Sequence, residues 1–229
     1  MGKRQESRDR IERQIVELGR QHLVTSGAAG LSLRAIAREL GMVSSAVYRY
    51  VASRDDLLTL LLVEAYTELA DAVDHARDTS GGAWSARLLA MARAARQWAI
   101  DQPASWALLY GSPVPGYHAP AELTVGPGTR VVGALFGVIA AGIRAGDIAA
   151  SNVQVGEPMS GDFDQLRVEF TFDGDDEAVA KGFLLWATLV GAISLEVFGQ
   201  YGADTLTDPA AVFDLQVELL LGALTAPAA

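Results

Sequence analysis

The sequence contains no cysteine, which excludes disulfide bonds, thiolate catalysis and cysteine-bound metal ions. It has only three histidines, so few side chains remain that favour a transition-metal site. A long apolar run is also missing. The most apolar stretch, residues 182–197, includes Glu196 and is shorter than the roughly 20 residues that a membrane-spanning helix needs. The charged start MGKRQESRDR lacks the apolar segment of a secretory signal. These absences predict a cytoplasmic protein that does not enter a membrane.

Motifs of catalysis are missing as well. The sequence holds no G-x-S-x-G, no H-E-x-x-H and no glycine-rich phosphate-binding loop, and no pair of carboxylates lies on an apolar face. We therefore expect no enzymatic activity, no cofactor and no metal site. A non-enzymatic carrier of small molecules remains an alternative, and such a protein would not retard DNA in a gel.

Positive charge is scarce and unevenly placed in a chain whose formal net charge is −10. Residues 1–56 hold ten Lys/Arg and seven Asp/Glu, a net charge of +3, whereas residues 57–229 hold eight and 21, a net charge of −13. A mildly basic head followed by a strongly acidic body is expected of a DNA-binding domain joined to a domain that DNA repels.

The stretch from Leu33 to Ala52, LRAIARELGMVSSAVYRYVA, predicts a helix, a tight turn and a second short helix. Its apolar residues recur at helical spacing, and Gly41 stands where a helix end needs a residue that accepts a positive φ. Ser44 or Ser45 is expected to cap the second helix with its side-chain oxygen, and the small Ala37 lets the two helices cross closely. This is the helix-turn-helix pattern, whose second helix enters the DNA major groove. A pair of packed helices without a DNA-binding role would have a similar pattern.

The longer segment GLSLRAIARELGMVSSAVYRYVASRDDLL resembles the DNA-binding head of the TetR family of bacterial transcription regulators. The family pattern has a Gly-hydrophobic pair, a Tyr, a His-Phe, then Ser-Lys-Glu and two leucines. The corresponding residues here are Gly41-Met42, Tyr48, Tyr50-Val51, Ser53-Arg54-Asp55 and Leu57-Leu58. Two positions depart from the pattern, since Tyr50 stands where His is usual and Val43 where a small polar residue is common. Tyr50 can still donate a hydrogen bond to a phosphate, whereas Val43 leaves helix capping to Ser44.

The resemblance implies which head residues contact DNA. The donors that fall where the family's head contacts the DNA backbone are Ser32, Tyr48, Tyr50 and Arg54. The residues that begin their helices and are candidates for contact with base edges are Arg34, Ser44 and Ser45. Arg49 would contact either a base or a phosphate. Two alternatives stay open, namely Tyr48 as a core tyrosine with an exposed hydroxyl and Arg34 as a solvated helix residue.

Beyond the head the pattern is helical nearly throughout, which predicts an all-α fold. We expect a three-helix helix-turn-helix head in residues 1–56 and a helical ligand-binding and dimerisation domain in residues 57–229. Residues 147–176 differ, because they are rich in Asp, Glu, Gly and Ser, and apolar and polar residues alternate from Leu166 to Phe172, which favours a strand. A short β-hairpin insertion near residues 152–173 is one expectation, and a mobile acidic loop is the other.

The last two predicted helices, residues 177–200 and 209–224, are apolar on nearly every side. Such a helix must be buried on every side, so we expect a second subunit to cover part of each in a four-helix bundle about a two-fold axis. The candidate interface residues are Leu189, Ile193, Phe213, Leu220 and Leu224. A monomer that uses both helix faces in its own core is the alternative.

Two observations bear on a small-molecule pocket in the body. Residues 186–196 resemble a C-terminal domain of some TetR-like regulators that is marked by a Trp, a His-Gly pair and Ser-Leu-Glu, with Val190 here in place of the His. Large side chains at helical spacing are candidates for the pocket, with a plain apolar core as the alternative: Met91, Trp98, Trp106, Tyr110, Phe136 and Trp186. Because ligand pockets are mostly apolar, we expect an apolar or aromatic effector, and the acidic body favours neutral or cationic molecules.

These patterns together predict a ligand-responsive transcriptional regulator. The leading interpretation is a repressor that binds a palindromic operator in double-stranded DNA as a homodimer and that a small effector releases. A transcriptional activator with the same parts is the alternative.

Overall fold

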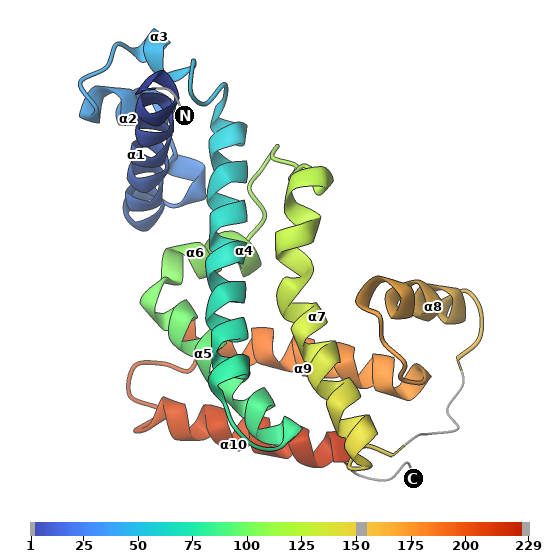
Figure 1. Ribbon diagram of the computed structural model, residues 1–229. Helices are drawn as coiled ribbons and strands as arrows, with labels where there is room; N and C mark the ends of the chain where they lie inside the picture. The colour runs from blue at the N-terminus through green and yellow to red at the C-terminus, as the bar shows by residue number, and fades with distance from the viewer. Residues whose placement is uncertain (1–2, 150–154, 226–229) are drawn as a thin grey trace. The chain divides into compact units, whose positions relative to one another are not determined.

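The computed structural model describes residues 3–149 and 155–225, and this part of the chain is built from helices (Figure 1). The elements are α1 (Lys3–Ser26), η1 (Ala28–Gly30), α2 (Leu33–Glu39), α3 (Ser44–Val47), α4 (Arg54–Thr79), α5 (Trp84–Asp101), α6 (Pro103–Tyr110), α7 (Ala121–Ala145), α8 (Met159–Phe170), α9 (Asp176–Val197) and α10 (Pro209–Thr225). The described residues contain no strand, which confirms the predicted all-α fold.

The chain divides into two compact units. The first comprises residues 1–68 and 101–128, and the second comprises residues 69–100 and 129–229. The division falls inside α4 and α7, so each of these helices contributes to both units. The functional boundary expected between residues 56 and 57 lies near the start of α4 and remains a prediction about role.

The core of the first unit joins α1, α2, α3 and the beginning of α4. Ile15, Ile36 and Val47 are fully buried in it, as the helical spacing of the sequence predicts. Gly19 allows α1 and α4 to approach closely, because a Cβ at this position would lie 3.3 Å from methyl carbons of Leu57 and Leu61. A stable head therefore needs the first turns of α4 as well as the three helices that precede it.

The α6 helix and the loop after it also belong to the first unit. α6 packs against α1, and the loop places Val114 and Tyr117 on the same apolar core. The Tyr117 hydroxyl and the Thr59 hydroxyl form a hydrogen bond of 2.9 Å. The segment between α6 and α7 is thus attached to the head by both apolar and polar contacts.

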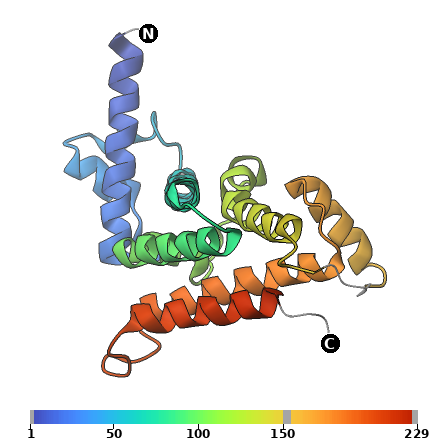
Figure 2. The same cartoon turned by 60° about the horizontal axis from the view of Figure 1, so that its bottom comes forward.

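In the second unit, α9 and α10 run side by side (Figures 1 and 2). The guanidinium of Arg96 on α5 donates two hydrogen bonds, of 2.7 and 2.5 Å, to the Glu196 carboxylate on α9. It also lies 5.8 Å from the centre of the Phe213 ring on α10. One turn earlier on α5, Arg93 makes a second bidentate contact, with Asp214 on α10. These charged pairs attach α5 to both of the last two helices.

Two helices, α7 and α9, are long and apolar enough to span a membrane by length and composition alone. Core helices of water-soluble proteins pass the same test, and each of the two carries fully buried residues of the second unit, such as Ile139 and Ile193. α9 also carries Glu196 in its ion pair with Arg96. Packing inside the protein therefore accounts for part of their apolar character.

The expected β-hairpin near residues 152–173 was wrong for residues 159–170, which form α8. The other strand of that hairpin was expected at residues 153–155, which lie mostly outside the described residues. The alternation that favoured a strand coincides with a helical spacing, since Phe163, Leu166 and Phe170 recur at three and four residues and cover one face of α8. In a strand, the side chain of Val168 would lie on the same face as those of Leu166 and Phe170. In the structure it is 83% exposed.

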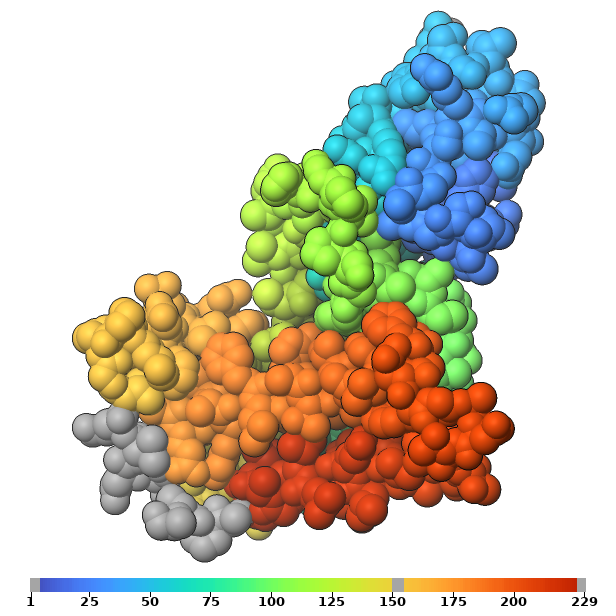
Figure 3. Space-filling model, turned by 180° about the vertical axis from the view of Figure 1, so that it is seen from behind, coloured from blue at the N-terminus to red at the C-terminus, as the bar shows by residue number. Residues whose placement is uncertain are grey.

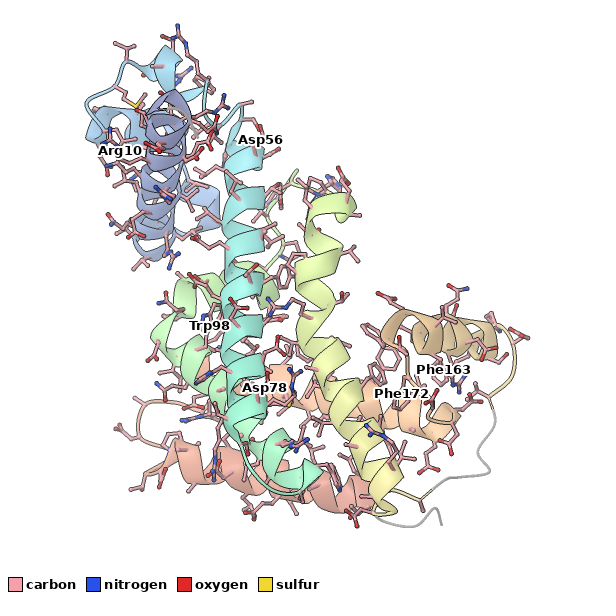
Figure 4. All side chains as sticks on the ribbon, in the orientation of Figure 1. Arg10, Asp56, Asp78, Trp98, Phe163 and Phe172 are labelled. Atoms are coloured by element: carbon pink, nitrogen blue, oxygen red, sulfur yellow. The ribbon has the colours of Figure 1, made fainter. Side chains whose placement is uncertain are left out.

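Aromatic side chains attach α8 to α7 and α9. Phe136 of α7 stacks on Phe170, with ring centres 5.2 Å apart, and contacts Phe172 at 4.9 Å. Phe163 stacks on Phe183 of α9 at 6.2 Å. Figure 4 labels Phe163 on α8 and Phe172 in the segment that follows it. α8 and the residues directly after it are therefore attached to the second unit by a cluster of aromatic rings.

This cluster makes Gly182 sensitive to substitution. A Cβ on Gly182 would lie 2.6 Å from the Phe136 ring, and the ring cannot retreat freely because Phe170 and Phe172 hold it. We expect Gly182→Ala to lower the free energy of unfolding by about 1–3 kcal/mol in urea denaturation, since overpacking a filled core is unfavourable. The control is Gly137→Ala on α7, which meets no atom within 4 Å and should raise stability by up to about 1 kcal/mol. Equal effects of the two changes would contradict this account of the packing.

Candidate nucleic-acid interface

The turn between α2 and α3 has the geometry expected of a helix-turn-helix. The Ser32 hydroxyl caps α2 by accepting a hydrogen bond from the Ala35 N–H at 3.4 Å. Gly41 adopts a φ of +67°, and the Met42 N–H donates to the Ala37 carbonyl at 2.8 Å. Ala37 is fully buried. The left-handed glycine and the small alanine thus fix the crossing of the two helices.

The capping of α3 differs from the expectation that Ser44 or Ser45 performs it. Val43 is the N-cap residue, with φ −67° and ψ 140°, and makes no side-chain capping bond. Its carbonyl accepts the Ala46 N–H at 2.8 Å. Because Ser44 is already the first residue of α3, its hydroxyl does not perform the capping role, and both serine side chains are exposed.

The residues expected to contact base edges lie on the solvent side of the first unit. Arg34, Ser44, Ser45 and Arg49 are all exposed. Arg34 belongs to the first turn of α2, Ser44 and Ser45 begin α3, and Arg49 follows α3 by two residues. α2 and α3 pack against each other in the head (Figure 1). Exposed polar side chains on the second helix and at the start of the first are the arrangement that a major-groove contact requires.

The residues expected to contact phosphates differ in their exposure and in their hydrogen-bond partners. Tyr48 is 43% exposed, which favours a surface role over a core one, whereas Tyr50 is half-buried against the apolar core. Ser32 uses its oxygen as an acceptor, and its hydroxyl hydrogen remains a donor. Arg54 donates from Nη2 to the carbonyls of Ala28, at 2.8 Å, and Ala29, at 3.4 Å. Arg54 therefore supports η1 as well as carrying a charge near the proposed DNA surface.

Arg8 lies outside the helix-turn-helix motif, in the basic start of the chain. It lies on α1 and donates to the Arg49 carbonyl just beyond α3, at 3.4 Å, and to Glu12 at 2.7 Å. The contact with Glu12 is the main cause that raises the pKa of Arg8. Its sequence signal is only a basic residue near the start of α1, and the contact with Arg49 arises from the tertiary fold.

Arg54 gives a direct test of a phosphate contact. We expect Arg54→Ala to weaken binding to all DNA sequences alike and to reduce the slope of log affinity against log salt by about one unit, because one counterion fewer is released. The matched control is Arg144→Ala, which removes the same charge at an exposed end of α7 and should leave the slope unchanged. A changed base preference with an intact salt slope, measured by fluorescence anisotropy, would count against the contact. A thermal melt of the variant reports the contribution of Arg54 to η1.

The five candidate interface residues differ in burial within the protomer. Leu189, Ile193, Phe213 and Leu224 are buried in the second unit, and Leu220 is half-buried. A groove of about 470 Å³ between α9 and α10 is lined by Thr188, Gly191, Ala192, Leu195, Tyr201, Gln216, Leu219 and Leu220. Large apolar side chains on α9 and α10, and one just after α9, face solvent, and two of them also line the groove. They are Phe183, Leu184, Leu195, Phe198, Leu215 and Leu219. Figure 3 shows the two helices forming one continuous surface.

The six candidate pocket residues fall in both units. Met91, Trp98, Phe136 and Trp186 belong to the second unit, and Trp106 and Tyr110 belong to the first. Figure 4 labels Trp98 on α5. Trp106 is buried, and its ring centre lies 4.4 Å from that of Tyr110. Burial is the main cause that raises the pKa of the Tyr110 hydroxyl, and the nearby Tyr66 is the smaller cause. Tyr110 therefore stays a neutral hydrogen-bond donor at physiological pH.

The described residues include no group of three or more His, Cys, Asp or Glu side chains placed to bind a metal ion.

Residues 88–220 match the family model described as "Tetracyclin repressor-like, C-terminal domain". An HTH-type transcriptional regulator of Mycobacterium tuberculosis is 65% identical over 225 residues, which cover 98% of this chain and 96% of that protein. An HTH-type transcriptional repressor of Streptomyces coeruleorubidus is 37% identical over 79 residues, 34% of this chain and 28% of that protein.

Among solved structures, the one described as "putative regulatory protein SCO4313" is similar to this chain along its whole length. It covers 96% of this chain and 100% of its own, with a TM-score of 0.78 and 30% sequence identity. The arrangement of helices described above is thus shared with a protein of solved structure.

Proposed function

Because this chain belongs to the TetR family of bacterial transcription regulators, we propose that it represses transcription as an operator-bound homodimer and that a small molecule releases it from DNA. Members of the family are DNA-binding regulators and not enzymes. The observation that carries the proposal is the packed α2–α3 pair, on and directly after which Arg34, Ser44, Ser45 and Arg49 are exposed.

The proposed division of labour follows the sequence boundary. Residues 1–56 bind DNA, with Ser32, Tyr48, Tyr50 and Arg54 on phosphates and Arg34, Ser44 and Ser45 on bases. Residues 57–229 bind the effector and dimerise. The net charges of +3 and −13 support this division, because phosphates attract the head and repel the body. Operator binding places the protein in the cytoplasm.

Repression is favoured over activation by the name of the 37%-identical relative, a transcriptional repressor. A reporter gene placed behind the operator separates the two roles. Expression that falls when this chain is supplied supports repression, and expression that rises supports the activator alternative.

The proposed dimer face is the exposed apolar side of α9 and α10 rather than their buried side. Leu184, Leu195, Leu215 and Leu219 are exposed in the protomer, and a soluble monomer rarely leaves so many large apolar side chains together in water. Of the five residues expected from sequence, Leu220 lies at this face, and the other four stabilise the helices that present it.

The proposed effector is apolar or aromatic, and neutral or cationic. It acts by binding one arrangement of the two heads more tightly than the other, which shifts the population away from the DNA-binding arrangement. Of the four tryptophans, Trp98, Trp106 and Trp186 are the candidate pocket residues whose fluorescence a ligand would quench. Tyr110 is the polar group that would orient the ligand.

The test is tryptophan quenching by a panel of hydrophobic anions, neutral molecules and cations, followed by operator release measured by gel retardation. We expect neutral or cationic aromatic compounds both to quench the fluorescence and to release DNA. If only anionic acyl compounds do both, the acidic body does not select neutral or cationic effectors. If nothing quenches and Trp106→Ala leaves every response unchanged, the pocket assignment fails.

A further inference from the structure

Val43 is an apolar residue in an unusual place. It precedes α3 as its N-cap and is 71% exposed. Serine, threonine, aspartate and asparagine are strongly preferred at an N-cap because their side chains accept a helix N–H, which valine cannot do. An exposed isopropyl group also gains nothing from burial. Val43 thus departs from two local preferences without a visible gain in the folded protein, and departures of this kind are expected at functional positions.

The backbone holds Val43 in a defined position. The Gly41 φ of +67° and the hydrogen bond from Met42 N–H to the Ala37 carbonyl fix the turn before it. The bond from Ala46 N–H to the Val43 carbonyl, at 2.8 Å, fixes the helix start after it. A β-branched side chain has few rotamers. The head therefore presents a rigid apolar group directly beside the exposed hydroxyls of Ser44 and Ser45.

The chemistry of the major groove offers one apolar partner for such a group. The N-terminal residues of a recognition helix contact base edges, and among the four bases only thymine carries a methyl group, at C5, on the major-groove edge. From this match we infer that Val43 is a specificity-determining residue that contacts the C5 methyl of a thymine in each operator half-site. The inference rests on the proposed function, since it requires α3 to enter the major groove.

The experiment uses the full chain and an operator obtained by selection from random DNA. Thymines are replaced by deoxyuridine one symmetric pair at a time, which removes the methyl group and keeps base pairing. Burial of one methyl contributes about fourfold in affinity. Replacing the symmetric pair of thymines that Val43 contacts should therefore lower the operator affinity of the wild-type protein by about fifteenfold.

Two variants show whether this effect belongs to Val43. Val43→Ala should bind the natural operator more weakly by a similar factor and should not respond to deoxyuridine at that position. Val43→Ser should do the same while supplying a capping side chain, which separates base contact from helix stability. The control is Val24→Ala, since Val24 is 69% exposed on the same head. It lies about 24 Å along α1 from Arg8, at the end away from α3. This variant should respond as the wild type does.

The outcomes separate the inference from the proposed function. If the wild type binds the operator but no thymine methyl matters, the inference alone is overturned. The inference is also overturned if Val43→Ala loses affinity at the same deoxyuridine position as the wild type does. This includes a variant whose affinity is lower by the same factor on every duplex. If the wild type binds no DNA, the proposed function falls and the inference with it. A methyl effect at one position that both Val43 variants abolish and Val24→Ala retains supports the inference.

Discussion

Replacement of Leu219 by aspartate is expected to convert the proposed dimer into a monomer and to lower operator affinity at least about a hundredfold, because two linked heads hold DNA far more tightly than one. Leu219 is 68% exposed in the protomer and lines the groove between α9 and α10. The substitution therefore leaves the core intact but would place a charge in an apolar interface, where an unpaired carboxylate is strongly unfavourable. Light scattering gives the oligomeric state, and gel retardation gives the affinity.

The matched control for this prediction is Val168→Asp. Val168 is 83% exposed on α8, so the change adds the same charge to the same unit outside the proposed face. This variant should remain a dimer with unchanged operator affinity. A Leu219→Asp protein that is still a dimer would place the interface on another surface. A monomeric variant with full affinity would contradict the requirement for two heads.

The second large effect concerns stability. Arg96→Ala is expected to lower the free energy of unfolding by about 3 kcal/mol or more, because it leaves the Glu196 carboxylate without its partner in a largely buried site. The two side chains are only 14% and 17% exposed. Arg96 also lies over the Phe213 ring, so its loss affects both α9 and α10. For a chain of this length, a change of that size corresponds to a fall in Tm of roughly 6–12 °C.

Arg93 supplies the comparison for Arg96. It lies one turn away on α5 and makes a bidentate contact with Asp214 of the same geometry, but it is mostly exposed. Exposed ion pairs contribute about 0–1 kcal/mol, so Arg93→Ala should change Tm little. The hydrogen bonds from Arg93 lower the pKa of Asp214, and the stability they add is therefore lost as the pH falls through that lowered pKa. Similar Tm values for the two variants would show that burial does not distinguish the pairs.

The head was predictable from sequence because its determinants are local. Helical spacing of apolar residues, Gly41 in the turn and the small Ala37 each act within a few residues, and the structure has the positive φ and the buried alanine that they predict. The cap of α3 was not predicted, because a shift of one residue decides whether Val43 or Ser44 occupies that position.

The body was harder to predict for two physical reasons. Around residue 168 the sequence suits period 2 and a helical face at once, and only packing of the Phe163, Phe170 and Phe172 rings decides for the helix. In α9 and α10, apolar residues occur on every side, so the pattern cannot distinguish the side that faces the chain's own core from the side that faces solvent. Leu189 and Leu219 look alike in sequence and differ sharply in burial.

For the candidate pocket, too, helical spacing predicts burial but not which residues lie in the same compact unit. Helical spacing identified large inward side chains such as Trp106 and Phe136, and both are buried. The spacing does not reveal that α6 joins the first compact unit while α7 from Thr129 onward joins the second. Which residues share a unit depends on contacts between distant segments, for which a single sequence carries no local signal.

The most direct test of the proposal is selection of the preferred operator from random double-stranded DNA, followed by footprinting and measurement of the number of chains bound. The account predicts enrichment of an inverted repeat whose two half-sites lie about one helical turn apart, bound by two chains at once, with affinity that falls steeply as salt rises. Failure to enrich any sequence, or enrichment of a site without two-fold symmetry bound by a single chain, would contradict it.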